Sequence, residues 1–462
     1  MRAPRAGLLP LYIQLYDEVR PEVRRQFLPF LDAVTRGLTA EGVEVSHAPV
    51  CCRASEFKAA VARLEALGVD IIVTIHLAYS PSEESAPALC ATRLPILMLD
   101  TTMDASFGPT VAPGRLMFNH GIHGVQDLAA VFRRRGRPFT IVAGHWRKSN
   151  VLKRAAGIVR AAQAAQAFRS ARVLRIGRAF PGMGDFAVKP ADLRRDLGIT
   201  VKEIPPAGLA PHVRRVTAKE VAAEVGLDRR RYAVTASVEA HRRSVRIGLG
   251  LRNCLADGGY TAFSMSFLDF NDKRGAVNTV PFLEASKAMA AGIGYAGEGD
   301  ALTAALVGGL AQGFGRTTFS EIFCPDWQGG DLFLSHMGEV NPAVAARRPD
   351  LVEMDYVFSQ ALNPAYLACA VRPGPALFVN LSPGPRGSYR LIVADVTVKK
   401  DTRRKDWHRS VRAWMRPAIP VDEFLERYSR LGGTHHSALV LDGQVESLEA
   451  FAQFAGLEFA RV

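Results

Sequence analysis

Four short segments, far apart in the chain, each carry a carboxylate or imidazole side chain beside glycine or at the edge of an apolar run. They are Gly297–Asp300, Thr318–Glu321, Leu334–Met337 and Gly432–His436. Mixed oxygen and nitrogen donors of this kind bind divalent ions such as Mn²⁺ or Co²⁺. Two carboxylates held on one metal can also move a proton between adjacent carbon atoms of a substrate. The segments therefore predict one metal centre with acid–base chemistry.

Each of these side chains also has a structural explanation when it is taken alone. Glu298 lies near a helix start, where the helix dipole favours an acidic residue. His336 ends a strand-like run, and a single histidine there is more often structural. Glu321 follows a β-prone run in an apolar neighbourhood, where an unpaired carboxylate would be costly. A shared metal gives all of them partners at once, so we favour it over separate structural roles.

His435 and His436 are adjacent, and adjacent side chains of a strand point to opposite faces. At most one of the two is therefore expected to face a given metal. The other could support the ligand or contact the substrate. From the residues alone, either histidine could be the ligand.

The segment Gly292–Gly297 formally matches the G-x-G-x-x-G pattern of dinucleotide-binding proteins. That fingerprint must follow a strand and open a helix. The preceding residues, Leu283–Ala290, are helical in pattern, so no strand is expected to feed the turn. We therefore expect no nucleotide cofactor, and we expect the glycines to let the backbone turn tightly and present Glu298.

The elements that must position these residues begin as an alternation of helices and apolar strands. Strand-like runs at 7–15, 69–75, 95–99 and 139–143 alternate with helical patterns at 22–38, 54–67 and 150–168. The middle third continues in the same way, with helices predicted at 237–257, 281–290 and 301–313. The last third changes to successive strand-like runs separated by glycine and proline turns.

This pattern predicts an α/β fold with two doubly wound parallel-sheet domains followed by a mixed, β-rich C-terminal domain. The expected boundaries are 1–168, 169–316 and 317–462. In parallel sheets, ligands bind beyond the carboxyl ends of the strands. His76 and the Gly144–Trp146 segment follow strand-like runs and occupy such ends.

Composition excludes several classes of protein. The 462 residues are 48% hydrophobic and 22% charged, which is typical of a globular protein. No apolar run reaches the roughly 18 residues that a membrane span needs, so we expect no membrane partner. Six scattered cysteines without a C-x-x-C pair indicate free thiols in a reducing cytoplasm.

The net charge is +13, with basic clusters at Arg133–Arg135, Arg229–Arg231 and Lys399–Lys405. Nucleic acid binding is one interpretation of such charge. The clusters are dispersed, mixed with acids and lack the interleaved aromatic residues that single-strand binders use. We therefore expect no nucleic acid partner.

Several motifs together resemble the L-arabinose isomerase family. They are Asn119–Gly124, Gly144–Trp146, Thr261–Phe263, Tyr295–Asp300, Ser335–Val340 and Gly432–His436, and they occur in the family's order. The resemblance covers nearly the whole chain. L-Fucose isomerases share the architecture, but their metal motif differs from the one in this sequence.

The resemblance implies a manganese ion bound by Glu298, Glu321, His336 and His436, with Co²⁺ or Mg²⁺ as possible substitutes. It also implies substrate contacts from His123, Phe267 and Gln14, while His435 is left as a substrate or supporting contact. The implied reaction is an aldose–ketose isomerisation of a free sugar such as L-arabinose, through a cis-enediolate, with Glu298 and Glu321 transferring protons. The family also implies a homo-oligomer, a hexamer, with active sites completed by a neighbouring subunit.

Three other hypotheses fit parts of the sequence. A metal-assisted hydride shift could replace proton transfer. A non-catalytic sugar-binding or regulatory protein could use the same fold, although binding alone does not require a pair of acids. A nicotinamide-dependent dehydrogenase would rest on Gly292–Gly297 alone. The sequence does not name the sugar, because a few polar contacts in the pocket decide it.

Overall fold

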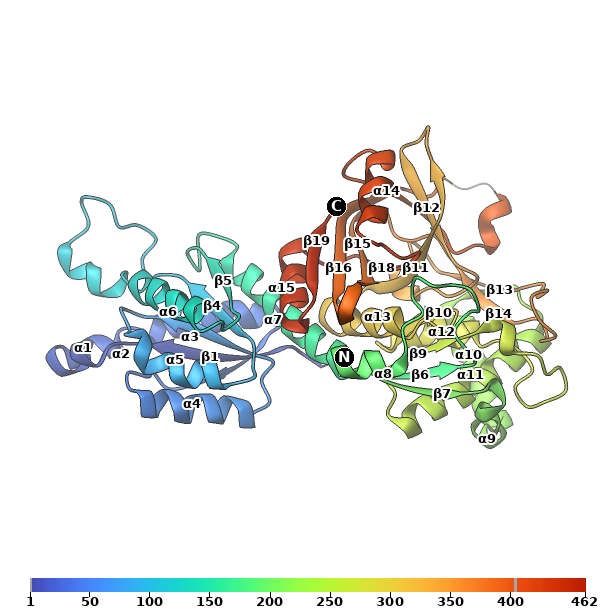
Figure 1. Cartoon of the computed structure of the whole chain (residues 1–462), viewed down its shortest axis with the longest axis horizontal. Coiled ribbons are helices and arrows are strands. Elements are labelled where there is room, and N and C mark those ends of the chain that lie inside the picture. Colours follow the sequence, from blue (N-terminus) through green and yellow to red (C-terminus); the bar gives the residue numbers. More distant parts are fainter. Residues whose placement is uncertain (1, 403–404) are drawn as a thin grey trace. The chain divides into compact units, whose positions relative to one another are not determined.

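The computed structural model describes residues 2–402 and 405–462, and the chain divides into two compact units (Figure 1). The N-terminal unit comprises residues 2–163 and 449–454, and the larger unit comprises 164–448 and 455–462. The predicted boundary at 316 falls inside the larger unit and stays a prediction. Of the predicted basic segment 399–405, Arg403 and Arg404 lie outside the described residues.

The N-terminal unit is built on a five-stranded, all-parallel sheet in the order β2-β1-β3-β4-β5. Its strands are β1 (Arg5–Leu11), β2 (Glu44–His47), β3 (Ile71–His76), β4 (Ile96–Asp100) and β5 (Thr140–Ala143). All six residues of β3 are buried, as expected for a strand covered on both faces. The first predicted parallel-sheet domain is therefore confirmed.

Helices surround this sheet (Figure 1). They are α1 (Gln14–Val19), α2 (Pro21–Arg25), α3 (Leu28–Ala40), α4 (Ala54–Ala66), α5 (Ser82–Ala91), α6 (Ile122–Arg134) and the first part of α7 (Val151–Arg169). The single helix predicted at 22–38 is wrong, because the chain forms α2 and α3 there. Pro29 lies in the first turn of α3, where proline favours a new helix start.

In the larger unit, a second all-parallel sheet has the order β10-β9-β6-β7, which confirms the second predicted parallel-sheet region. Its strands are β6 (Arg172–Ile176), β7 (Thr200–Ile204), β9 (Ala262–Met265) and β10 (Gly294–Gly297). The segment Gly294–Gly297, whose glycines were predicted to form a tight turn, is therefore the edge strand β10. Gly294 must lack a side chain, because an added Cβ would lie 2.1 Å from the Ala304 carbonyl oxygen.

The helices of this region begin and end at recognisable caps. They are α8 (Pro190–Asp192), α9 (Ala210–Arg215), α10 (Ala218–Arg231), α11 (Val238–Gly258), α12 (Phe282–Ala290) and α13 (Ala301–Phe314). Ser237 caps α11 by accepting the Ala240 N–H, and Gly259 ends it at φ +59°. Asp300 caps α13, and nearly every residue of α13 is buried. That helix connects β10 to the following strand and carries the chain from one sheet to the next.

The C-terminal third forms a seven-stranded mixed sheet in the order β15-β18-β11-β12-β17-β16-β19, and β15 also pairs with β16. The strands are β11 (Thr317–Asp326), β12 (Asp331–Ser335), β15 (Gly374–Pro383), β16 (Tyr389–Val398), β17 (Ala413–Pro417), β18 (His436–Val440) and β19 (Glu458–Arg461). The β15–β16 pairing closes six antiparallel strands into a barrel, and β19 adds to β16 in parallel. The mixed, β-rich C-terminal region is therefore confirmed.

The remaining elements of the larger unit are a small sheet in the order β14-β13-β8 and two helices. They are β8 (Ala233–Val234), β13 (Asp350–Glu353), β14 (Ala365–Ala368), α14 (Val421–Arg430) and α15 (Val445–Ala455). Residues 449–454 of α15 belong to the N-terminal unit. The buried core of the larger unit includes Phe378, Met415 and Phe424 from the barrel strands and α14.

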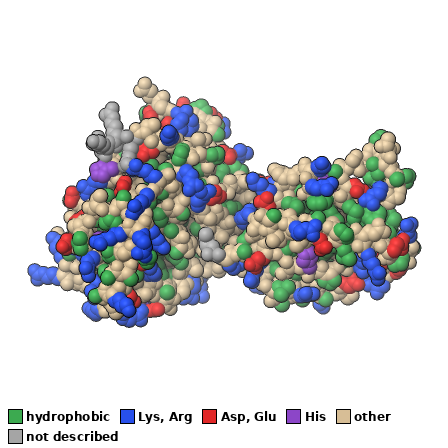
Figure 2. All heavy atoms as spheres, turned by 180° about the vertical axis from the view of Figure 1, so that it is seen from behind, with side chains coloured by type: hydrophobic (Ala, Val, Ile, Leu, Met, Phe, Trp, Pro, Cys, Tyr) green, Lys and Arg blue, Asp and Glu red, His purple; other side chains and the backbone are tan. Residues whose placement is uncertain are grey.

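Basic side chains are spread over the face drawn in Figure 2 and lie among acidic ones. Among the described residues, no helix combines the length and apolar character that crossing a bilayer requires. All six cysteines carry free thiols.

Candidate metal centre

Strand register brings three of the predicted ligands together at one end of the barrel. Glu321 on β11 is paired with His436 of β18 on one side and with Ser335 of β12 on the other. His336 follows Ser335 directly. A β-bulge interrupts β11 just beyond, between Ile322 and Cys324, and bulges of this kind often occur beside functional sites.

Glu298 reaches the same place from the parallel sheet, at the carboxyl end of β10. Its backbone is left-handed, at φ 62°, which non-glycine residues rarely adopt. Gly297 has no room for a side chain, because an added Cβ would lie 2.7 Å from the His336 ring. Gly299 turns at φ +82° against the Arg178 carbonyl. The two glycines therefore let Glu298 approach the histidines. Gly297, however, is the last residue of strand β10 and not part of the predicted tight turn.

The donor atoms of the four predicted ligands converge. His436 Nε2 lies 3.4 Å from Glu298 Oε2, and His336 Nε2 lies 3.7 Å from Glu321 Oε2. The ligand atoms of Glu321, His336 and His436 all lie within 4.8 Å of one another. Glu298, His336 and His436 are buried and Glu321 is half-buried. Glu298, His435 and His436 form a second group with the same spacing, so the structure brings the four predicted ligands into two overlapping groups that share His436.

Each imidazole in the cluster is held by a carboxylate on its Nδ1 atom. His436 Nδ1 lies 3.0 Å from Asp300, His336 Nδ1 lies 2.7 Å from Glu339, and His435 Nδ1 lies 2.6 Å from Asp185. A carboxylate there favours a proton on Nδ1 and leaves Nε2 free to bind a metal. All three rings therefore present Nε2 towards Glu298 or Glu321.

We expected only one of His435 and His436 to face the site, but the structure places both imidazoles beside Glu298. His435 Nε2 lies 3.6 Å from Glu298 Oε2, close to the 3.4 Å of His436. Strand alternation does not apply, because β18 begins at His436 and His435 lies in the preceding turn. The role of His435 as a substrate or supporting contact stays a prediction.

The two glutamates have opposite electrostatic environments. Burial by itself raises the pKa of Glu298, but His435 and His436 outweigh it and the pKa falls to about 2. Burial raises the pKa of Glu321, and the His336 charge offsets only part of that rise. Although burial opposes its charge, His436 has a pKa of about 9, because Asp300 and Glu298 stabilise the imidazolium. The cluster thus holds one strongly acidic carboxylate and one weakly acidic carboxylate.

The donor set fits a divalent metal. His436 Nε2 is buried and has no hydrogen-bond partner, which is costly for a polar atom unless a ligand binds it. Two donors that each lie about 2.1 Å from one ion are about 3–4 Å apart, which matches the Glu298–His436 and Glu321–His336 separations. Phe186 stacks on His436 at 4.7 Å, and Phe319 packs at 4.8 Å from His336 and 5.0 Å from His436. These rings restrict the imidazoles to their present orientation.

The predicted substrate contacts lie apart from these ligands in the chain. Phe267 follows β9 in the larger unit, is buried and packs on Phe180 and Phe358. His123 is exposed on α6 of the N-terminal unit. Gln14 begins α1 of that unit and accepts a hydrogen bond from Arg53 at 2.8 Å. The contact of all three with a substrate stays a prediction.

Sequence reasoning missed the carboxylates behind the histidines. Asp300 and Glu339 are 0% and 1% exposed, and Tyr295 donates to Glu339 at 2.5 Å. The sequence carried a signal for each, since Asp300 stands at a helix N-cap position and Glu339 lies three residues after His336. Asp185 had no such signal, because it lies 250 residues from His435.

Family models match both regions that build this site. The L-arabinose isomerase central domain matches residues 177–312, and the L-arabinose isomerase C-terminal domain matches residues 316–458. Together the two matches cover more than half of the chain.

Curated relatives extend the similarity into the N-terminal unit. An L-arabinose isomerase of Nocardioides sp. is 29% identical over 467 residues, covering 96% of this chain and 91% of that protein. One from Geobacillus kaustophilus is 29% identical over 404 residues, covering 84% and 79%. One from Aeromonas hydrophila is 27% identical over 412 residues, covering 85% and 80%.

Proposed function

Because the chain belongs to the L-arabinose isomerase family, which makes it an aldose–ketose isomerase, we propose that its turnover requires a divalent metal held by Glu298, Glu321, His336 and His436. The observation that carries this proposal is the buried, unpartnered His436 Nε2 atom, 3.4 Å from the Glu298 carboxylate. Buried polar atoms are mostly hydrogen-bonded, so an imidazole nitrogen of this kind beside a carboxylate supports a bound ligand.

The metal expected here is Mn²⁺, with Co²⁺ or Mg²⁺ as substitutes, since the donors are two carboxylates and two imidazoles. When bound, such an ion polarises the carbonyl group of an open-chain sugar and stabilises negative charge on its oxygen. Asp300 and Glu339 hold the Nδ1 atoms of His436 and His336 and so orient both Nε2 atoms for the ion, whose binding requires loss of the Nε2 proton.

The two glutamates are proposed to move the protons, one between C2 and C1 and the other between O2 and O1 of the sugar. Glu298 lies within 3.6 Å of two imidazoles, whereas the nearest imidazole to Glu321 is that of His336, at 3.7 Å, and the two carboxylate side chains are 11% and 20% exposed. The more weakly held and more accessible carboxylate is the better proton carrier, so we assign the carbon-bound proton to Glu321. Glu298 then serves mainly as ligand and as relay between the oxygens.

The substrate is proposed to be L-arabinose or a related free aldose. Phe267, together with His123 and Gln14, is expected to contact the sugar, and hydroxyl-specific contacts of this kind decide which aldose is accepted. An aldose panel, assayed with Mn²⁺ and with a chelator, tests both parts of the function. Ketose formation from at least one aldose, lost with chelator and restored with Mn²⁺, is the expected result. Sugar binding without ketose from any aldose would instead indicate a non-catalytic sugar-binding protein.

Solvent deuterium separates proton transfer from a hydride shift. In D₂O, a glutamate that exchanges its proton with solvent places deuterium at C1 of the ketose product. A hydride shift moves the original hydrogen and leaves no deuterium there. We expect deuterium at C1.

We also propose assembly as a homo-oligomer, a hexamer, in the cytoplasm. If subunits share sites, mixing His123→Ala protein with Glu298→Gln protein under conditions of subunit exchange restores partial activity. Each variant alone is expected to be inactive, so recovery of activity requires sites built from two chains. A fully active monomer in solution scattering would contradict this proposal.

A further inference from the structure

Two adjoining cavities lie in the larger unit beside the carboxyl ends of β7 and β9. The first, about 590 Å³, is lined by residues following β7 (205–211) and by the loop 269–277 after β9. The second, about 390 Å³, lies between α9, α11 and residues 275–278. Arg214, Gly275 and Ala276 line both, so the two cavities adjoin. Neither cavity is lined by any of the four predicted metal ligands.

The second cavity is lined by three arginines and by no carboxylate. Arg214 comes from α9, and Arg243 and Arg246 lie one turn apart on α11. Arg243 donates to the Asn363 carbonyl at 2.7 Å, which fixes its guanidinium, and its buried Nε has no hydrogen-bond partner. Within residues 2–402 and 405–462, Arg214 and Arg246 form no ion pair. Three arginines that line one cavity without a carboxylate suit a phosphate group.

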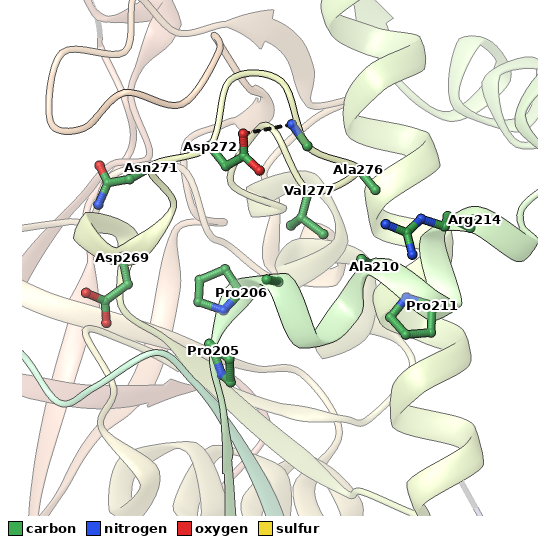
Figure 3. Close-up of a pocket in the computed structure, with 12 residues that line it drawn as sticks. Pro205, Pro206, Ala210, Pro211, Arg214, Asp269, Asn271, Asp272, Ala276 and Val277 are labelled. Carbon is green, nitrogen blue, oxygen red and sulfur yellow. Dashed lines mark hydrogen bonds between the residues drawn. The ribbon is translucent and has the colours of Figure 1, made fainter.

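The first cavity offers different chemistry. Its polar groups are Asp269, Asn271 and Asp272, and Pro205, Pro206 and Pro211 supply apolar surface. Figure 3 shows Arg214 at one side of this cavity and Asp269 and Asn271 at the other.

Both carboxylates of the first cavity are already partly neutralised. Asp269 pairs with Arg178 at 3.0 Å, and Asp272 accepts the N–H groups of Arg274 and Gly275 at 2.9 and 2.8 Å. A carboxylate has about four acceptor positions, so both acids keep capacity for hydroxyl donors. The repulsion between these acids and an anion on the arginines is correspondingly reduced.

We propose that the two cavities form one binding site for a phosphorylated sugar. The phosphate binds Arg214, Arg243 and Arg246, and the sugar hydroxyls bind Asp269, Asn271 and Asp272 over the proline surface. The site is built independently of the metal cluster, and its occupancy does not depend on isomerase activity.

Calorimetric titration of the full-length protein at near-physiological salt tests this site, with glucose 6-phosphate, glucose and inorganic phosphate as probes. Glucose 6-phosphate is expected to bind more tightly than inorganic phosphate, and glucose is not expected to bind. The double variant Arg214→Ser, Arg246→Ser should weaken glucose 6-phosphate binding at least about tenfold, because it removes two of the three cations that would hold the phosphate. Arg242→Ser is the matched control, because Arg242 is exposed on the same helix and does not line either cavity. It should leave binding unchanged.

Asn271→Ala tests the sugar half of the site. It should weaken glucose 6-phosphate binding and leave phosphate binding unchanged, and unchanged phosphate binding also shows that the arginine cavity is intact. Equal affinity for phosphate and glucose 6-phosphate would overturn the sugar half. Equal binding by wild type and the double arginine variant, or an equal loss in Arg242→Ser, would overturn the site altogether.

Discussion

Two clusters of charged groups lie in the larger unit, and they differ in how closely the opposite charges approach each other. In the first, which we call the ion-pair cluster, Lys287 lies 2.8 Å from Glu224 and 2.6 Å from Asp228, and Arg252 lies 2.8 Å from Glu284. In the second, the metal-centre cluster, the facing carboxylates and imidazoles are 3.4–3.7 Å apart and His436 Nε2 has no hydrogen-bond partner.

The backbone shows the same difference. The ion-pair cluster is carried by the helices α10, α11 and α12 in ordinary helical conformation, whereas Glu298 holds a left-handed conformation. Close pairing without backbone strain is typical of a structural cluster, and wide spacing with a strained residue is typical of a binding site. Asp228 Oδ1 of the ion-pair cluster also lacks a hydrogen-bond partner, so the two clusters are distinguished by the spacing of their charges and by backbone strain.

The largest expected effect concerns the glutamates of the metal-centre cluster. Glu298→Gln and Glu321→Gln keep the size of the side chain but remove its basicity. Each should lower turnover at least ~10²-fold, the usual scale of general acid–base catalysis. Turnover is measured with saturating Mn²⁺, and metal content is measured in parallel. Near-normal turnover with metal bound would show that the substituted glutamate transfers no proton.

The two adjacent histidines should differ in metal content. His436 is 0% exposed and its Nε2 has no other partner, so His436→Ala should lose the metal. His435 is half-buried, and His435→Ala should lower activity more than metal content. Elemental analysis after dialysis measures this, and loss of metal only in His435→Ala would reverse the assignment.

The ion-pair cluster should affect stability and leave catalysis unchanged. Glu224→Gln removes one of the two carboxylates that pair with Lys287 and one of the two that pair with Arg252, and should lower the free energy of unfolding by about 1.5–3 kcal/mol. Denaturant unfolding measures this change. Turnover of the folded variant should stay normal, and a turnover defect as large as that of Glu298→Gln would remove the distinction between the clusters.

The pH dependence of that stability has a defined sign. Burial alone would raise the pKa of Glu224, but Arg252 and Lys287 outweigh it and lower the pKa to about 2. A depressed pKa contributes stability above the unfolded value of about 4.5, and that contribution is lost as pH falls towards 2. Between these pH values, wild-type stability should therefore fall more steeply than that of Glu224→Gln.

A smaller effect on metal binding is expected from the carboxylate that holds Nδ1 of His436. In Asp300→Asn, the amide can still cap α13 with its oxygen, but its NH₂ group then faces His436 Nδ1. The proton of His436 is thereby favoured on Nε2, the atom that should bind metal. Mn²⁺ affinity should fall about 10–100-fold while the protein stays folded. A Mn²⁺ titration measures this, and unchanged affinity would show that Asp300 only caps the helix.

The sequence predicted the elements whose pattern is local. The helix expected at 301–313 extends over Ala301–Phe314, and the strand-like run before His336 is β12. It did not predict β10, because four residues containing two glycines resemble a turn until a neighbouring strand pairs with them. The break between α2 and α3 was also missed, since the apolar spacing continues across it.

Within the site, residue type and motif predicted the four side chains that converge, but not their geometry. The position of His435 beside Glu298 depends on where β18 begins. The pairing of Asp185 with His435 depends on a contact between residues 250 positions apart in the sequence. Such contacts follow from tertiary structure, and no local pattern records them.

The most direct test of the account is to measure Mn²⁺ binding and isomerase turnover in the same samples. Protein stripped with chelator is titrated with Mn²⁺, bound ion is followed by electron paramagnetic resonance, and ketose formation is assayed at each point. We predict that turnover rises in proportion to bound Mn²⁺ up to a single ion per chain, and that His436→Ala neither binds the ion nor turns over. Full turnover in protein shown by elemental analysis to be metal-free would contradict the central claim.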